Sequence, residues 1–162
     1  MKKESLSLFV GLSLAATALP LPGQAAGTWA DRSTACVAAI TPAFLASVFK
    51  NPAGASTDKN PPGDDGCTTG VGDDVIKFQL RATVSSVQFD DVQKKYHSSF
   101  LPLAGVGDKA LFAADGSGLD AWKSNRSCDV VVIPLDPGNL KINGKALATK
   151  LGEICNQLLA LP

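Results

Sequence analysis

Residues 75–84, VIKFQLRATV, carry the pattern that decides the fold. Ile76, Phe78 and Leu80 alternate with Lys77 and Gln79, and the alternation continues to the end of the stretch. A period of two places successive side chains on opposite faces of a β-strand. The stretch therefore predicts a strand whose sheet has one face in the core and the other in water.

Signals for a hairpin precede this strand. Residues 67–69 form a short run that suits a strand, and the segment 70–74, GVGDD, is rich in turn residues. Together they predict that 67–69 pairs with 75–84. The preceding segment, 53–65, contains glycines and prolines without any apolar period, which is typical of a surface loop.

Signals for a helix follow the strand. Ser85 or Ser86 can cap the first turn, because a serine hydroxyl accepts a hydrogen bond from an orphan backbone amide. We expect the core-facing stripe of this helix to consist of Phe89, Val92, Tyr96 and Phe100.

The rest of the chain predicts three more strands and two more helices. Residues 109–114, 119–124 and 128–135 have the pattern of an antiparallel meander, with turns at 115–118 and around Asn125-Arg126. Thr41-Pro42 begins one helix and Asn143 begins another. The last helix is expected to bury Leu147, Leu151, Ile154 and Leu158 on one face.

The order of these elements predicts an α+β fold. Tight turns between successive strands indicate a mainly antiparallel sheet of about five strands, with three helices packed on it. No internal repeat or long linker divides the chain. We therefore expect residues 26–162 to form a single α+β domain.

The N-terminus has the pattern of a signal peptide. Lys2 and Lys3 precede an apolar stretch, residues 6–21, and Gly23-Gln24-Ala25 supplies the small residues that signal peptidase needs. We expect residues 1–25 to be cleaved, which predicts a secreted or periplasmic protein without membrane insertion after cleavage. The first cysteine lies too far from the cleavage site for lipid attachment.

The cysteine count fits this destination. Cys36, Cys67, Cys128 and Cys155 are an even set in a chain expected to be exported, which favours disulfides. Their wide spacing and the single histidine argue against zinc. Three connectivities are possible, and local chain order favours Cys36 with Cys67 and Cys128 with Cys155.

The sequence offers little chemistry for catalysis. Residues 105–109, GVGDK, lack the spacing and the following helix of a phosphate loop, so they are interpreted as a tight turn. His97 has no recognisable nucleophile or orienting acid, and we expect an exposed helical histidine. No catalytic residue, metal ligand or cofactor is predicted. The formal net charge of zero gives no electrostatic case for nucleic acid.

The best candidate ligand-binding residues are Trp122 and Asp120. They share one sheet face because they lie two positions apart in the strand 119–124. If the helices cover the other face, Trp122 points outward and marks a contact surface; a second helical layer would bury it instead.

Several segments resemble those of a known group of proteins. These are Cys36 with the following residues 40–43 (ITPA), Cys67 ahead of an alternating strand, and residues 105–112 (GVGDKALF) ahead of the meander. The chain resembles small bacterial secreted proteins and lipoproteins of uncharacterised function, best known from actinobacteria. The resemblance implies a bacterial envelope protein with an α+β domain, and it carries over no catalytic residue.

These observations favour a non-enzymatic binding domain whose partner is a protein or a small molecule. One alternative is an inhibitor or immunity protein that blocks a partner enzyme, for example by inserting the loop 53–66. A further alternative is a hydrolase that uses dispersed carboxylates such as Asp108 and Asp120.

Overall fold

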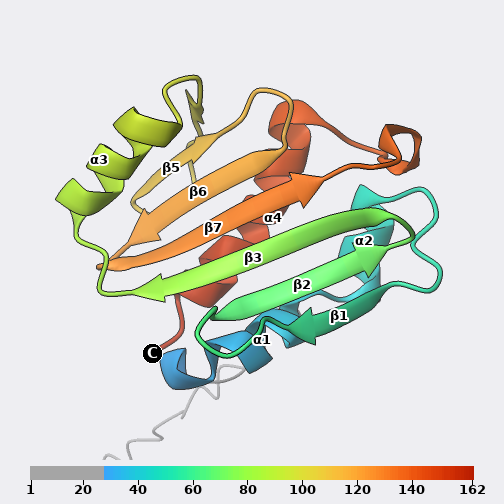
Figure 1. Cartoon of the computed structure of the whole chain (residues 1–162), viewed down its shortest axis with the longest axis horizontal. Coiled ribbons are helices and arrows are strands. Elements are labelled where there is room, and N and C mark those ends of the chain that lie inside the picture. Colours follow the sequence, from blue (N-terminus) through green and yellow to red (C-terminus); the bar gives the residue numbers. More distant parts are fainter. Residues whose placement is uncertain (1–27) are drawn as a thin grey trace, which may run out of the picture.

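The computed structural model describes residues 28–162, so the expected signal peptide, residues 1–25, lies outside the described part of the chain. Seven antiparallel strands form one sheet in the order β1-β2-β3-β7-β6-β5-β4 (Figure 1). The strands are β1 (Ser56–Lys59), β2 (Gly66–Val71), β3 (Asp74–Ala82), β4 (Leu101–Pro102), β5 (Lys109–Phe112), β6 (Gly118–Lys123) and β7 (Arg126–Ile133).

Two runs of consecutive strands make up the sheet. The first run is β1-β2-β3 and the second is β4-β5-β6-β7, and β3 pairs with β7 to join them. That pairing runs from Val75 opposite Ile133 to Ala82 opposite Arg126. The strand predicted from the alternation in 75–84 is therefore an interior strand of the sheet, with neighbours on both sides.

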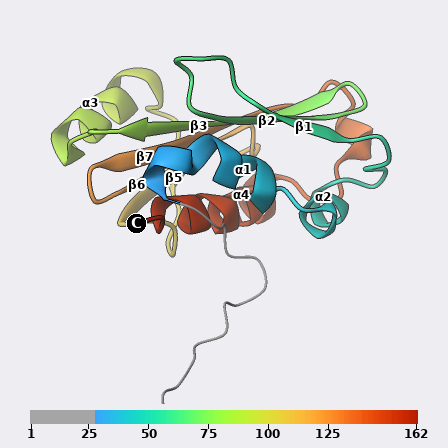
Figure 2. The ribbon, with the colours of Figure 1, turned by 90° about the horizontal axis from the view of Figure 1, so that it is seen from below.

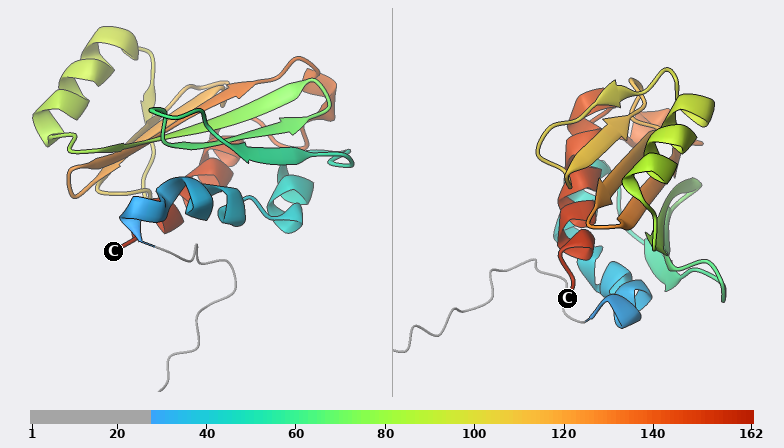
Figure 3. Two further views of the ribbon diagram at one scale, coloured as in Figure 1. Left: turned by 60° about the horizontal axis from the view of Figure 1, so that its bottom comes forward. Right: turned by 90° about the vertical axis from the view of Figure 1, so that its left-hand side faces the viewer.

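Four α-helices accompany the sheet: α1 (Arg32–Ala39), α2 (Pro42–Val48), α3 (Ser86–Tyr96) and α4 (Gly144–Leu159). Single 3₁₀ turns occupy Trp29–Asp31 and Pro137–Asn139. Helices α1, α2 and α4 lie on one side, which we call the inner face, with α1 against β2 and α4 against β6 and β7 (Figure 2). Helix α3 lies on the opposite side, the outer face (Figure 3).

The core lies between the inner face and these helices. Phe78, Leu80 and Leu119 from the sheet and Leu147 and Leu151 from α4 are almost fully buried there. The disulfide Cys36–Cys67 links α1 to β2, and Cys128–Cys155 links β7 to α4. This is the pairing that the sequence predicted.

Local signals explain the beginnings of two helices. The Thr41 hydroxyl accepts a hydrogen bond from the Phe44 amide, and Pro42 occupies the first turn of α2. At α3, the Ser85 hydroxyl accepts from the Gln88 amide while the Gln88 side chain accepts from the Ser85 amide. This reciprocal capping box fixes the start of α3.

The α+β class, the antiparallel sheet and the two disulfides are as predicted, but the numbers of strands and helices are larger. Helix α1 was not expected, because the side chains that it buries, Ala35, Cys36 and Ala39, are too small to give a strong apolar stripe. The segment 53–65 was wrongly assigned to a loop, since it contains β1. As a mostly exposed edge strand, β1 shows no apolar alternation.

Strand β4 was also missed. It contains only Leu101 and Pro102, both exposed, at the other edge of the sheet. Proline is tolerated there because an edge strand has one side free of ladder hydrogen bonds. Among residues 28–162, no helix is both long and apolar enough to cross a membrane.

Candidate functional site

Two aspartates face each other on the outer face of the sheet. Asp120 on β6 is the register partner of Asp129 on β7, and Asp129 in turn lies opposite Gln79 on β3. Directly opposed side chains of an antiparallel pair have Cβ atoms about 4.5–5.5 Å apart, and like charges at such positions repel each other. The sheet therefore brings two carboxyl groups together at a cost in stability.

Helix α3 covers this pair with a face that differs from the predicted stripe. Phe89 and Gln93 are its buried residues, and His97 follows one turn later as the C-cap. Val92 is 42% exposed and Tyr96 is 65% exposed, so both were wrongly placed in the core-facing stripe. Residues four apart share a helix face, which directs Phe89, Gln93 and His97 to the sheet.

His97 reaches the aspartate pair. Its Nε2 lies 3.3 Å from Asp120 Oδ2, and its ring packs against Phe100 with centroids 4.3 Å apart. The side chain is only 31% exposed, so the expectation of an exposed helical histidine was wrong. The reason is its position at the end of α3, where the i, i+4 face meets the sheet.

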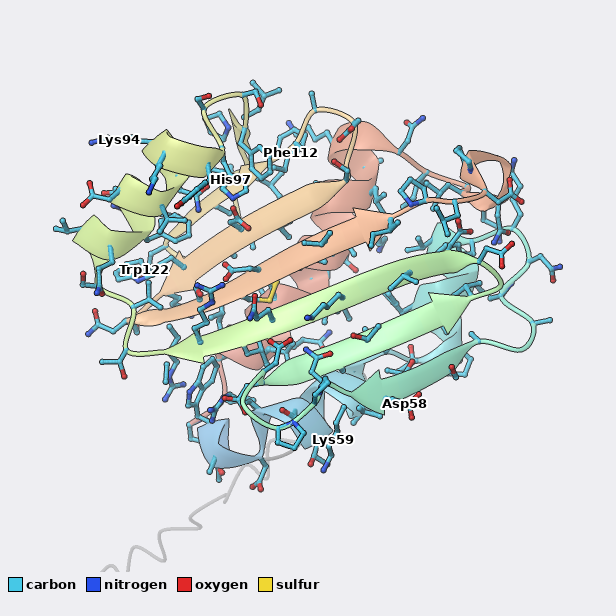
Figure 4. All side chains as sticks on the ribbon, in the orientation of Figure 1. Asp58, Lys59, Lys94, His97, Phe112 and Trp122 are labelled. Carbon is cyan, nitrogen blue, oxygen red and sulfur yellow. A yellow bond between two sulfur atoms is a disulfide. The ribbon has the colours of Figure 1, made fainter. Side chains whose placement is uncertain are left out.

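A cavity of about 200 Å³ separates α3 from the outer face, and we call it the α3 cleft. Figure 4 shows His97 on α3 turned toward strand β6 on this face. The lining combines carboxyl, amide and cationic groups with apolar walls. It consists of Gln79, Arg81, Val84, Phe89, Val92, Gln93, His97, Asp120, Ser127, Asp129 and Val131.

Two acceptors in the α3 cleft are buried without a hydrogen-bond partner. They are Asp120 Oδ2 and Gln93 Oε1, and each residue is 7% exposed. The His97 contact does not satisfy Asp120 Oδ2, because it lacks hydrogen-bond geometry. Buried polar atoms are nearly always paired, so two unpaired acceptors in one small cleft need an explanation.

The protonation of the pair is shifted toward the neutral form. Burial, followed by repulsion from Asp120, raises the pKa of Asp129 to about 7 against the lowering effect of Arg81. Burial also raises the pKa of Asp120, with His97 and then Gln93 acting in the opposite direction. Asp129 therefore retains its proton at a pH where an ordinary aspartate has lost it.

Arg81 lies at the rim of the cleft. Its Nε lies 3.4 Å from Asp129 Oδ2, and its Nη2 donates to Gln79 Oε1 at 3.1 Å. The Arg81 side chain is 53% exposed, so solvent screens this ion pair. The Ser127 hydroxyl donates to the same Asp129 oxygen at 3.3 Å.

Of the two candidate binding residues, the α3 cleft contains only Asp120. Trp122 shares the outer face, but it lies beside the cleft near the start of α3 (Figure 4). Its Nε1 donates to the Val84 carbonyl at 2.7 Å, and the Lys109 ammonium lies 5.9 Å from its ring centroid. Trp122 therefore holds the segment that leads into α3.

Asp108 also lies outside the cleft. It is exposed in the turn before β5, where its Oδ2 accepts from the Ser124 amide at 3.4 Å. The same turn contains Gly107, whose positive φ and close approach to the Trp122 carbonyl exclude any side chain. Residues 105–109 form the tight turn that the sequence indicated, and of the two carboxylates named for a hydrolase only Asp120 lines the cleft.

A larger cavity, of about 330 Å³, lies at the other end of the sheet. It is lined by the 115–117 turn, the end of β7, Pro137 and residues 140–143. A hydrogen bond from the Ser117 amide, followed by one from its hydroxyl, lowers the pKa of Asp115, as expected of a carboxylate that orders a turn. In the described residues, no buried polar atom of this lining lacks a partner. The α3 cleft is therefore the better candidate site.

Sequence reasoning missed Asp129, Gln93 and Arg81, although one signal pointed to Asp129. The β6–β7 hairpin turns at Ser124 and Asn125, which both have positive φ, as a two-residue type I′ turn requires. Placing the turn there pairs Lys123 with Arg126 and, three residues further, Asp120 with Asp129. The turn predicted around Asn125-Arg126 was one residue too late.

The comparisons with known proteins add no relative: no protein-family model, no curated protein and no solved structure matches the chain. Within residues 28–162, no group of three or more histidine, cysteine, aspartate or glutamate side chains is arranged to hold a metal ion.

Proposed function

We propose that the protein is a non-enzymatic exported binding domain that acts in the bacterial cell envelope or outside the cell and takes its ligand in the α3 cleft. The observation that carries this proposal is the pair of buried, unpartnered acceptors, Asp120 Oδ2 and Gln93 Oε1. A protein tolerates such atoms where a ligand completes their hydrogen bonds.

The surface beside the cleft supports a larger contact. Val131 is 52% exposed and Ile133 is 47% exposed, and both point from β7 to the outer face. In Figure 1, α3 lies toward the β5–β6 side of the sheet, and no helix lies over β3 and β2 on this face. Exposed apolar side chains next to a polar cleft are typical of surfaces that contact a partner.

Export is supported by the covalent structure. Two disulfides are typical of extracellular and periplasmic proteins, because the cytoplasm keeps thiols reduced. The charged and then apolar N-terminus, residues 1–25, fits the same destination.

Capture of a ligand from a cell-envelope extract tests the proposal. We expect immobilised residues 26–162 to retain a specific partner, and the Asp120→Asn and Val131→Glu variants to lose it. The control is Asp58→Asn, which removes an exposed carboxylate from the distant strand β1. Equal capture by all four proteins would overturn the assignment of binding to the α3 cleft.

The same experiment addresses the inhibitor alternative, in which the retained partner is a single stoichiometric enzyme whose activity falls on binding. The proposed inhibitory loop, residues 53–66, is tied down in the structure by an ion pair of Asp65 with Arg32 and by contacts of Asp64 with Lys77 and Gln79. These contacts favour the outer face over the loop as the binding surface.

A carboxylate-dependent hydrolase is the second candidate function, favoured by the opposed Asp120 and Asp129. A carboxyl pair of which one member holds its proton near neutral pH is suited to acid–base catalysis. Hydrolysis of glycoside, ester or peptide substrates that disappears in Asp129→Asn would establish this function and overturn the non-enzymatic proposal.

A further inference from the structure

We propose that the α3 cleft recognises an organic cation, an ammonium or guanidinium group carried on a short apolar stem. This inference rests on the proposed binding function and names the chemistry of its ligand. Three features of the cleft lead to it: its unpaired groups, its walls and its charge.

The unpaired groups are all acceptors. Asp120 Oδ2 and Gln93 Oε1 accept no hydrogen bond, although His97 Nε2 lies 3.3 Å from Asp120 Oδ2, and Asp129 lies opposite Asp120 with Arg81 and the Ser127 hydroxyl beside its carboxyl group. An ammonium group has three donors and no acceptor, and a guanidinium has five. Either group would satisfy the unpaired oxygens, whereas an anion would face two carboxyl groups.

The walls and size limit the rest of the ligand. Val84, Phe89, Val92 and Val131 give the cleft an apolar lining around its polar floor. The volume of about 200 Å³ is below the roughly 300–1,000 Å³ of pockets for drug-sized molecules. It suits a small amine or one basic side chain of a protein partner.

Charged and titratable groups surround the Asp120–Asp129 pair, and a bound cation competes with a proton for its carboxyl oxygens. Asp129 faces Asp120 from β6 and Arg81 from β3, His97 at the end of α3 contacts Asp120, and the Lys109–Asp90 ion pair lies beside Trp122. Because Asp129 retains its proton near neutral pH, a cation bound between the two carboxyl groups has to replace it. Affinity should therefore rise between about pH 6 and pH 8, and binding should release a proton.

A substitution of Arg81 distinguishes cation recognition from a purely structural role of the residues in the α3 cleft. Its guanidinium already lies beside Asp129, so it repels an incoming cation and competes for the same oxygen. Above about pH 8, where the proton no longer competes, replacing it in Arg81→Gln should tighten cation binding about threefold or more, whereas removal of a structural contact would leave affinity unchanged or lower.

The experiment uses titration calorimetry and two-dimensional NMR on residues 26–162 with defined probes. The probes are n-butylammonium, n-butylguanidinium, a lysine blocked at both backbone ends, and the neutral and anionic controls 1-pentanol and pentanoate. We expect one of the cations to bind saturably and to shift the side-chain signals of Gln93 and His97, while the controls do not. Asp120→Asn and Asp129→Asn should weaken binding about tenfold or more.

The relative affinities of the probes indicate whether the natural ligand is a free amine or a basic side chain of a protein partner. Tighter binding of the blocked lysine than of n-butylammonium indicates a side chain of a protein partner, and the reverse order indicates a free amine. Both results support cation recognition. Because the NMR shifts are measured on the wild-type protein, the test holds even if an aspartate variant does not fold.

Two results would overturn the inference. One is equal binding of 1-pentanol and the cations, which would make the cleft an apolar pocket only. The other is absence of cation binding from pH 6 to pH 8. If Asp120→Asn still abolished partner capture in either case, the binding function would stand without this ligand class. If the cations bound but partner capture did not depend on the cleft, the proposal that the partner binds in the α3 cleft would be wrong.

Discussion

The two faces of the sheet are built differently, and β7 shows the contrast within one strand. Cys128, Val130 and Val132 point to the inner face, and all are at most 4% exposed. Ser127 and Asp129 point to the outer face, where both line the α3 cleft. The inner face is thus apolar, covalently linked to α4 and closed, while the outer face combines carboxyl groups with an open cleft.

This difference indicates that the inner face stabilises the fold and that the outer face destabilises it. Burial of apolar side chains and the two disulfides stabilise the inner face. On the outer face, two opposed carboxyl groups and unpaired acceptors destabilise the folded state. Natural proteins retain such destabilising features mainly at functional sites. The contrast can be tested by changing one face at a time.

The largest effect is expected from the inner face, on removing the disulfide Cys128–Cys155. The two cysteines are 27 positions apart, and loop closure of that length with the loss of two buried sulfur atoms should lower the free energy of unfolding by about 4 to 5 kcal/mol. Urea unfolding of the Cys128→Ala, Cys155→Ala double variant measures this loss.

The pairing itself is checked by peptide mapping without reduction. We expect peptides that contain Cys36 with Cys67 and Cys128 with Cys155. A peptide joining Cys36 to Cys155 would contradict both the pairing and the packing of α1 and α4 on the sheet. The double variant should retain cation binding wherever it remains folded, because the disulfide lies on the other face.

The second effect has the opposite sign and comes from the outer face. Asp129→Asn should stabilise the protein at high pH, because it removes a carboxyl group that is costly to ionise in the folded state. The pKa of Asp129 is about 7 when folded and 3.8 as the ordinary value, which corresponds to at most about 4 kcal/mol. We expect a gain of about 2 to 4 kcal/mol above pH 8.

The direction with pH follows from linkage. The folded state holds the Asp129 proton more tightly than the unfolded state, so the contribution of Asp129 to wild-type stability is most favourable below about pH 4 and falls as the pH rises toward 7. The variant lacks this fall, so its advantage is near zero at pH 4. Urea unfolding at pH 4, 6 and 8 measures it, with Asp58→Asn as control. An advantage that did not grow with pH would refute the costly ionisation of Asp129.

The contrast between the faces also explains what the sequence could predict. The strand in 75–84 and the inner stripe of α4 were predictable because apolar side chains alternate with polar ones wherever one face is buried. The cysteine pairing followed from chain order. Strands β1 and β4 were not predictable in this way, because edge strands bury little and so leave no apolar period.

The site was harder to predict because it breaks the rule on which sequence reasoning depends. The buried face of α3 contains Gln93, while Val92 and Tyr96 are exposed, so the apolar pattern indicated the wrong face. The pairing of Asp120 with Asp129 depended on the register of one hairpin. A turn at 125–126 instead of 124–125 would place Val131 opposite Asp120, so an error of one residue hid the pair.

The smallest effects compare the two faces at neighbouring positions. Val130 is 1% exposed on the inner face and Val131 is 52% exposed on the outer face of the same strand. Val130→Ala should lower the free energy of unfolding by about 2 kcal/mol, since it leaves a cavity in the core. Val131→Ala should change it by less than about 0.5 kcal/mol, as is usual for surface substitutions.

For ligand affinity the order of the two effects should reverse, because only Val131 of the two valines lines the α3 cleft. Urea unfolding and titration of n-butylammonium on both variants measure the two quantities. Equal losses of stability, or a loss of binding confined to Val130→Ala, would show that the two faces do not divide stability and binding between them.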